Sequence, residues 1–215
     1  MANGSLPDPV PLTRSQLRVL GTLIKLQFTR PDHYPSPVDV VAAGCNQPLE
    51  HEDIKIFEKS EVHSSLMELI RLGLVSVQQT ELGFQYLHNA AKLMHLGPAQ
   101  LALMGVLFLH GPQTAQEILD RSYRLYPFRN CKHVDDALAS LGTQRATPLV
   151  KAVHLRSSKD PRYLHLFQTR KPNEQAQLLT KSQKAPAKTE RIQKLENRVA
   201  ELEQIVNRLS AHKPE

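Results

Sequence analysis

Few residues of this sequence have the types and spacing that catalysis or metal binding requires. Ten histidines and two cysteines are present, yet there is no H-x3-H pair and no C-x2-C pair, the spacings typical of zinc sites. Cys131 and His133 come closest, without further ligands nearby. Solvated or buried histidines explain the sequence better than a metal site, so we expect no metal and no other cofactor.

Cys45 is the other candidate for chemistry, as a nucleophile. A cysteine nucleophile needs an adjacent base, which the sequence does not indicate, and Cys45 lies at the end of a predicted helix among apolar residues. Burial in the core is the better interpretation. The sequence also lacks the glycine-rich loops that bind nucleotide phosphates. We therefore expect a protein that is not an enzyme.

Basic side chains are the more informative feature, because they are unevenly distributed. The net charge of the chain is +6. Residues 12–90 hold 7 Lys/Arg and 9 Asp/Glu, whereas residues 96–170 hold 10 Lys/Arg and 5 Asp/Glu. Residues 171–215 hold 9 Lys/Arg and 6 Asp/Glu. A polyanion such as double-stranded DNA is thus expected to meet the second half of the chain. The candidate nucleic-acid-binding residues are Arg121, Arg124, Arg129 and Lys132 around two predicted helices, and Arg156, Lys159 and Arg162 on a predicted hairpin.

Acidic side chains limit this expectation. Glu61 and Glu68 lie on the outward face of one predicted helix, and Asp135 and Asp136 on that of another. Carboxylates repel phosphates, and among the bases cytosine N4 offers them a partner. We expect modest, weakly specific DNA binding through the second half, as in a transcription regulator. The alternative is a protein–protein interaction adaptor with no nucleic-acid role.

The elements that position these residues begin with a repeat. Residues 12–23 align without a gap on residues 96–107, and both follow the pattern L-x3-Q-L-x3-G-x-L. Self-similarity at a fixed offset indicates an internal duplication. Each copy also predicts a helix start, because Thr13 with Gln16 forms a capping box and Gly97 precedes a proline at the first helical position.

Each copy continues with the same order of predicted elements. In residues 12–90 a second, short helix is predicted with Ser36 as its cap and Pro37 as its first residue. Ser60 caps a third helix over 61–72, and strands follow at 74–77 and 84–87. In residues 96–170 the order repeats: Thr114 with Glu117 opens the second helix, Asn130 caps the third, and strands cover 149–153 and 162–166. Three helices and a hairpin are typical of a winged helix, so we predict an α+β, mainly helical chain with two tandem winged-helix domains.

The ends of the chain predict different structure. Residues 1–11 are expected to be disordered and residues 171–188 to form a solvated linker. Residues 189–211 predict an amphipathic helix whose seam favours a parallel coiled-coil homodimer, with a helix docked on its own chain as the alternative. The seam consists of Ile192, Leu195, Val199, Leu202, Val206 and Leu209.

The sequence lacks three features that would indicate export or insertion into a membrane. Residues 1–11 do not have the basic and apolar regions of a signal peptide. No apolar run approaches the roughly 18 residues of a membrane span, and no disulfide framework is indicated. We therefore expect a cytoplasmic protein with no membrane partner.

Several motifs together resemble the YceH-like family of uncharacterised bacterial proteins, as far as about Phe167. They are Arg18-Val19-Leu20-Gly21, Thr29-x-Pro31-Asp32-x-Tyr34-Pro35, Cys45-Asn46-Gln47, Gly111-Pro112-Gln113-Thr114, Pro148-Leu149-Val150 and Arg162-Tyr163-x-His165-Leu166. The resemblance implies tandem winged helices and brings no established activity. Similar proteins continue Cys-Asn-Gln with a basic run, where this chain has Pro48-Leu49-Glu50-His51. The first predicted wing, 83–89, also has no Arg or Lys.

Overall fold

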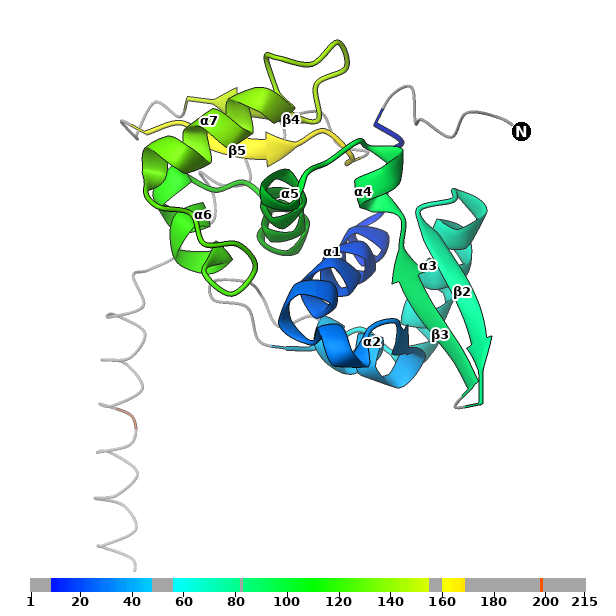
Figure 1. The fold of residues 1–215 in the computed structure, drawn as a ribbon. Coiled ribbons are helices and arrows are strands. Elements are labelled where there is room, and N and C mark those ends of the chain that lie inside the picture. Colours follow the sequence, from blue (N-terminus) through cyan, green and yellow to red (C-terminus); the bar gives the residue numbers. More distant parts are fainter. Residues whose placement is uncertain (1–8, 48–55, 82, 155–159, 169–197, 199–215) are drawn as a thin grey trace, which may run out of the picture. The chain divides into compact units, whose positions relative to one another are not determined.

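The computed structural model describes residues 9–47, 56–81, 83–154, 160–168 and 198. The chain divides into residues 1–172 and residues 173–215, and of the second unit only Arg198 is described. The described ranges contain seven α-helices and two small antiparallel sheets (Figure 1). The predicted α+β class is therefore confirmed.

The first repeat contains three helices and a three-stranded sheet with strand order β1-β3-β2. A fourth, short helix then leads into the second repeat. The elements are α1 (Arg14–Thr29), the 3-10 helix η1 (Pro31–His33), β1 (Ser36–Pro37), α2 (Val38–Cys45), α3 (Lys59–Arg71), β2 (Val75–Thr80), β3 (Gly83–His88) and α4 (Ala90–Leu93).

The second repeat has the same order of helices and hairpin, and its β4–β5 pair is antiparallel. Its elements are α5 (Pro98–His110), α6 (Ala115–Ser122), α7 (Cys131–Leu141), β4 (Val150–Val153) and β5 (Arg162–His165).

Local capping chemistry sets the start of four helices as predicted. At α1 the Gln16 side chain accepts from the Thr13 N–H at 2.8 Å, and the Thr13 hydroxyl accepts from the Gln16 N–H at 3.3 Å. Thr114 and Glu117 form the same reciprocal pair at α6. At α5 only half of the box exists, because Gly97 has no side chain and donates its N–H to Gln100. The Asn130 side chain caps α7.

The predicted starts of two helices are wrong, by one residue for α2 and by two residues for α3. Ser36 does not cap α2: its hydroxyl donates to the His33 carbonyl, and Ser36 pairs with Tyr86 of β3, so α2 begins at Val38. Ser60 does not cap α3, which begins at Lys59 after Glu58, whose carbonyl accepts the first helical hydrogen bond. Contacts beyond the local sequence hold both starts: Ser36 pairs with Tyr86 before α2, and Asn46 binds the backbone of Phe57 before α3.

The two hairpins match in register, which supports the duplication. His88 lies opposite Val75 in the first hairpin, and His165 lies opposite Val150 in the second. Both histidines are buried. The segments Tyr86-Leu87-His88 and Tyr163-Leu164-His165 thus occupy equivalent places, where side chains on alternate strand positions face the core.

The two repeats share one hydrophobic core, and their opening helices pack against each other (Figure 1). The glycine of the repeated pattern lies at this contact. A Cβ on Gly21 would lie 2.9 Å from Leu109 Cγ and 3.1 Å from Phe108 Cβ, and one on Gly105 would lie 2.7 Å from Ile24 Cγ2. Both glycines are needed because the helices approach too closely for a larger residue.

The Cys45-Asn46-Gln47 motif holds α2 against α1. The Arg18 guanidinium donates from Nε to the Cys45 carbonyl at 2.8 Å and from Nη2 to the Gln47 carbonyl at 2.9 Å. The Asn46 amide makes two hydrogen bonds with the backbone of Phe57, at 2.8 and 2.9 Å. Cys45 is fully buried, as expected, and burial raises the pKa of its thiol. These motif residues therefore have structural roles.

Candidate nucleic-acid interface

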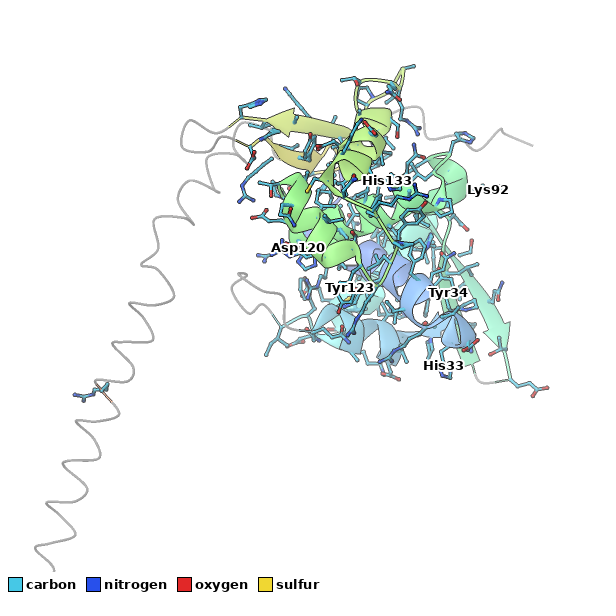
Figure 2. All side chains as sticks on the ribbon, turned by 60° about the vertical axis from the view of Figure 1, so that its left-hand side comes forward. His33, Tyr34, Lys92, Asp120, Tyr123 and His133 are labelled. Carbon is cyan, nitrogen blue, oxygen red and sulfur yellow. The ribbon has the colours of Figure 1, made fainter. Side chains whose placement is uncertain are left out.

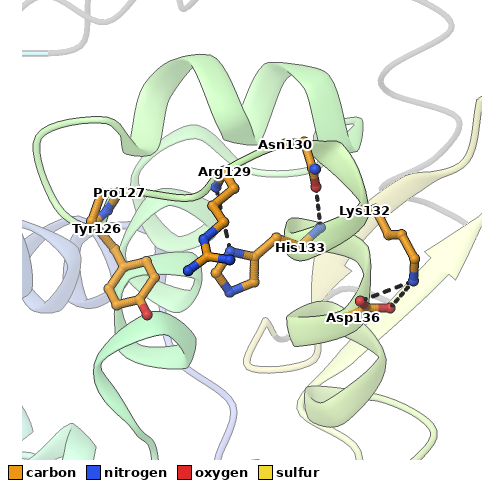
Figure 3. A pocket seen from close by; sticks show the side chains of 7 residues that line it. All are labelled: Tyr126, Pro127, Arg129, Asn130, Lys132, His133 and Asp136. Atoms are coloured by element: carbon orange, nitrogen blue, oxygen red, sulfur yellow. Dashed lines mark hydrogen bonds and ion pairs between the residues drawn. The ribbon is translucent and has the colours of Figure 1, made fainter.

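An open pocket lies beside the N-terminal end of α7, on the segment that joins it to α6 (Figure 3). Its volume is about 770 Å³. A helix N-terminus carries partial positive charge, which favours anions there. The residues that line the pocket are Tyr126, Pro127, Arg129, Asn130, Lys132, His133 and Asp136.

A group of rings positions this segment. The His133 ring lies edge-on to Phe128 at 5.2 Å and to Tyr126 at 6.1 Å between centroids. Its Nδ1 accepts from the Arg129 N–H at 3.4 Å, and its own N–H donates to the Asn130 cap at 2.9 Å. These contacts set the backbone before α7 and leave the Arg129 side chain exposed.

Lys132 and Asp136 form an ion pair one turn apart on α7, with the closer oxygen 3.3 Å from Lys132 Nζ (Figure 3). Their side chains are 81% and 65% exposed. Exposed pairs of this kind contribute at most about 1 kcal/mol to stability. The pair can therefore open at low cost, and Lys132 can exchange its carboxylate for a phosphate.

The two carboxylates predicted on the outward face of α7 differ in the structure. Asp136 pairs with Lys132, whereas Asp135 accepts a hydrogen bond from the Tyr163 hydroxyl of β5 at 3.0 Å. Burial and then this hydrogen bond to Asp135 raise the pKa of Tyr163 to about 12. Asp135 is thus engaged with the hairpin, and the repulsion expected from α7 is reduced.

Arg121 and Arg124 lie at the end of α6 and have different roles. The Arg121 guanidinium donates to Gln113 Oε1 at 2.6 Å and is half-buried. Arg124 is exposed and lies over the Tyr123 ring, 5.3 Å from its centroid. The Tyr123 ring is itself 66% exposed, and Figure 2 shows it on the side of the second repeat that faces the first. Arg124 is therefore the better placed of the two to contact a phosphate.

Arg162 points inward. Its two terminal nitrogens donate to the two Glu117 oxygens at 2.8 and 2.9 Å, and Nη1 also donates to the Pro112 carbonyl. Its side chain is 15% exposed. Burial alone would raise the pKa of Glu117, but the hydrogen bonds from Arg162 and Thr114 outweigh it and hold that pKa below its usual value. This geometry gives Arg162 a structural role, so the interface proposed below does not include it.

Replacing Arg162 with Gln is expected to destabilise the protein by about 2 kcal/mol, because hydrogen bonds to charged groups are among the stronger ones. Urea unfolding measures this, and Arg124→Gln, which removes an exposed guanidinium, is the matched control. An unchanged urea midpoint for Arg162→Gln would contradict the structural role.

The remaining candidates lie outside the described residues. Arg156 and Lys159 on the second hairpin are among them, and so are the six heptad residues, Ile192, Leu195, Val199, Leu202, Val206 and Leu209. Of the seven predicted DNA contacts, the structure brings Arg129 and Lys132 together at the pocket and Arg124 onto the segment that leads to it.

Sequence reasoning missed Tyr123, Tyr126 and His133 as parts of this site. The available signal was the alternation of aromatic and arginine residues over 123–129, which is typical of surfaces that bind nucleic acid through stacking and charge. It was overlooked because charge alone was counted.

The described ranges show neither a metal centre nor a membrane span. No three His, Cys, Asp or Glu side chains gather there as metal ligands would. Cys131, the nearest candidate in the sequence, lies 3.1 Å from Gln116 Oε1. No helix in that part of the chain is both long and apolar enough to cross a bilayer.

Comparison with known proteins extends the similarity over both repeats. A family model described as "Protein of unknown function, DUF480" matches residues 12–159. A UPF0502 protein of Shewanella piezotolerans is 34% identical over 213 residues, covering 93% of this chain and 94% of the relative. One from Pseudomonas savastanoi pv. phaseolicola is 32% identical over 209 residues, covering 94% and 93%. The names of these relatives state no activity.

Proposed function

The chain belongs to the DUF480 family of proteins of unknown function, as its resemblance to the YceH-like proteins led us to expect, and we propose that it binds DNA without acting as an enzyme. The observation that carries this proposal is the open pocket at the start of α7, where Arg129 and Lys132 are exposed beside aromatic rings. Each repeat is a winged helix in this proposal, supported by the repeated order of three helices and a hairpin.

In a winged helix the third helix enters the major groove and flanking groups contact the phosphates. Helix α7 takes that place in the second repeat. Its N-terminal turn offers Arg129, Lys132 and the positive end of the helix dipole to a phosphate. Asp136, on the same helix, repels the backbone unless it meets a cytosine amino group. Binding is therefore governed by phosphate contacts and has weak sequence specificity.

The proposed assembly is a homodimer joined through the predicted heptad helix, residues 189–211. Two linked copies present two basic sites, and binding at the second site becomes intramolecular once the first is occupied. This raises the overall affinity even when each site binds weakly.

The Arg129→Gln/Lys132→Gln double variant is expected to bind duplex DNA at least about tenfold more weakly at low salt, and to lower the slope of log K against log salt by about two. Fluorescence anisotropy of a mixed-sequence 30-mer duplex, titrated with full-length protein at several salt concentrations, measures both. The matched control is Lys59→Gln/Arg71→Gln, which removes the same charge from α3. In the wild type these two cations pair with Asp39 and Glu68.

Two outcomes would contradict the proposal. One is wild-type protein that binds no duplex at low salt; the other is a double variant whose salt slope equals that of the control. A lower slope of log K against log salt in Arg129→Gln/Lys132→Gln, with an unchanged slope in the control, would support a phosphate contact at the start of α7.

The second candidate function, a protein–protein adaptor, is favoured by one surface of the first repeat. Phe84 and Val77 are 60% and 43% exposed, and their register places them on the same face of the β2–β3 hairpin. Exposed apolar patches mark binding sites for other proteins. If wild-type protein does not bind DNA, this hairpin is the surface to vary in co-purification experiments.

A further inference from the structure

The end of α1 meets the segment after α6, so cations from the two repeats come together. A Cβ on Gly105 of α5 would lie 2.7 Å from Ile24 Cγ2 and 3.7 Å from Leu125 Cδ2. Lys25 follows Ile24 in α1, and Arg124 precedes Leu125 in the chain. The contact among these three apolar residues therefore brings Lys25 and Arg124 to the same edge of the core.

The charges around Lys25 reinforce one another. Burial lowers the pKa of Lys25, and the charges of Arg18, Arg124 and Arg30 lower it further. The same field acts on His110, at the end of α5: burial, then Arg121, Arg18 and Lys25 lower its pKa to about 4. This mutual repulsion is relieved when a polyanion binds, so the surface favours such a partner.

Within the part of the chain that the structure describes, the side chains at this edge have few competing partners of opposite charge. Lys25 Nζ donates to Gln47 Oε1, a neutral group, at 2.8 Å. Arg30 and Arg124 are exposed, and Arg124 lies over the Tyr123 ring. Two carboxylates are close in sequence, Asp32 after Arg30 and Asp120 before Arg121, and Asp120 accepts a hydrogen bond from Gln116. Glu117, which binds Arg162, also lies near Arg121, so the four cations Lys25, Arg30, Arg121 and Arg124 outnumber three acids among the described residues.

We propose that Lys25, Arg30, Tyr123 and Arg124 form a second contact for the DNA backbone, here called the junction surface, and that DNA bound at the α7 pocket continues across it onto α1. This inference rests on the proposed function. The α6–α7 segment connects the two sites directly, since Arg124 and Arg129 are five residues apart. The exposed Tyr123 ring adds a flat apolar face against which a sugar or a frayed base can pack.

The junction surface changes the expected path of the DNA. Counted over whole repeats, residues 12–90 are acidic and should avoid a polyanion. Lys25 of α1 nevertheless lies near Arg30 and near Arg124 of the second repeat, whereas Lys59 and Arg71 pair with acids of α2 and α3. Among the described residues of the first repeat, the phosphate contacts that we propose therefore lie at this edge.

The test compares two double variants of the full chain in the anisotropy titration with the 30-mer duplex. Lys25→Gln/Arg30→Gln should lower the salt slope by about two relative to wild type and weaken binding at 0.1 M salt by at least about tenfold. Lys59→Gln/Arg71→Gln removes the same charge from two ion-paired positions of α3 and should leave the slope unchanged. Because Lys25 is half-buried, Arg30→Gln alone is included and should lower the slope by about one.

The outcomes separate the inference from the proposed function. If both variants at Lys25 and Arg30 match the control while Arg129→Gln/Lys132→Gln loses slope, the junction surface is overturned and DNA binding at α7 stands. If wild-type protein shows no salt-dependent binding, both are overturned. Thermal unfolding of each variant excludes loss of fold as the cause of a lost slope.

Discussion

Replacing Gly105 with alanine is expected to destabilise the protein by about 1–2 kcal/mol, the usual cost of overpacking a core. In the middle of a helix this change normally stabilises by about 1 kcal/mol, because alanine has the higher helix propensity. Here the new Cβ would lie 2.7 Å from Ile24 Cγ2 and 3.4 Å from Ile24 Cβ. A β-branched side chain in a helix has one favoured rotamer, so Ile24 cannot turn away and the helices must separate.

A double-mutant cycle with Ile24→Ala isolates this contact. Removal of Cγ2 should make Gly105→Ala neutral or stabilising in that background, as measured by urea unfolding of the full chain. Gly97→Ser is the matched control, since a Cβ at Gly97 would meet only Gln100 Oε1 at 3.9 Å and serine is a good cap. Additive effects of the two core changes, or a stabilised Gly105→Ala protein, would show that α1 and α5 are not closely packed.

Lowering the pH from 7 to 5 is expected to destabilise the fold through its buried histidines. Burial lowers the pKa of His88 and of His165 from 6.5 to about 4. Below pH 6.5 the unfolded chain takes up a proton at each position, whereas the folded protein does so only near pH 4. Stability is therefore full above pH 6.5 and falls as the pH drops towards 4.

Each of these histidines accounts for about 2 kcal/mol of this loss at pH 5. Neither ring nitrogen of His88 has a hydrogen-bond partner among the described residues, so leucine can replace it without leaving a polar group unpaired. His88→Leu should reduce the difference in unfolding free energy between pH 7 and pH 5 by that amount. His63→Gln, at an exposed position on α3, should leave the difference unchanged. Equal pH dependence in all three proteins would refute the assignment to His88.

Local signals in the sequence predicted much of the fold. The caps of α1, α6 and α7 involve residues three apart, such as Thr13 with Gln16, so the sequence contains both partners. The starts of α2 and α3 were missed because distant segments fix them. Ser36 pairs with Tyr86, 50 residues away, and Phe57 is fixed by Asn46.

The candidate site was predicted less well, because charge counts do not show where a side chain points. Arg162 was predicted to contact DNA, yet Glu117, 45 residues earlier in the chain, binds its guanidinium and turns it inward. Lys25 was not among the predicted contacts, because the acidic residues of its repeat give that repeat a negative net charge. Only the packing of α1 against α5 reveals that Lys25 and Arg124 share an edge.

The glycine contact between α1 and α5 has the form of a two-fold symmetric interface. Gly21 and Gly105 are equivalent in the repeat, and so are Ile24 and Phe108. Gly21 meets Phe108 while Gly105 meets Ile24, so each half offers its partner the same pair of positions. Reciprocal contacts of this kind are typical of the isologous interface between two identical subunits. At this contact the two repeats meet as the subunits of a dimer would, but α4 joins them in one chain. Their association is therefore intramolecular and does not depend on protein concentration.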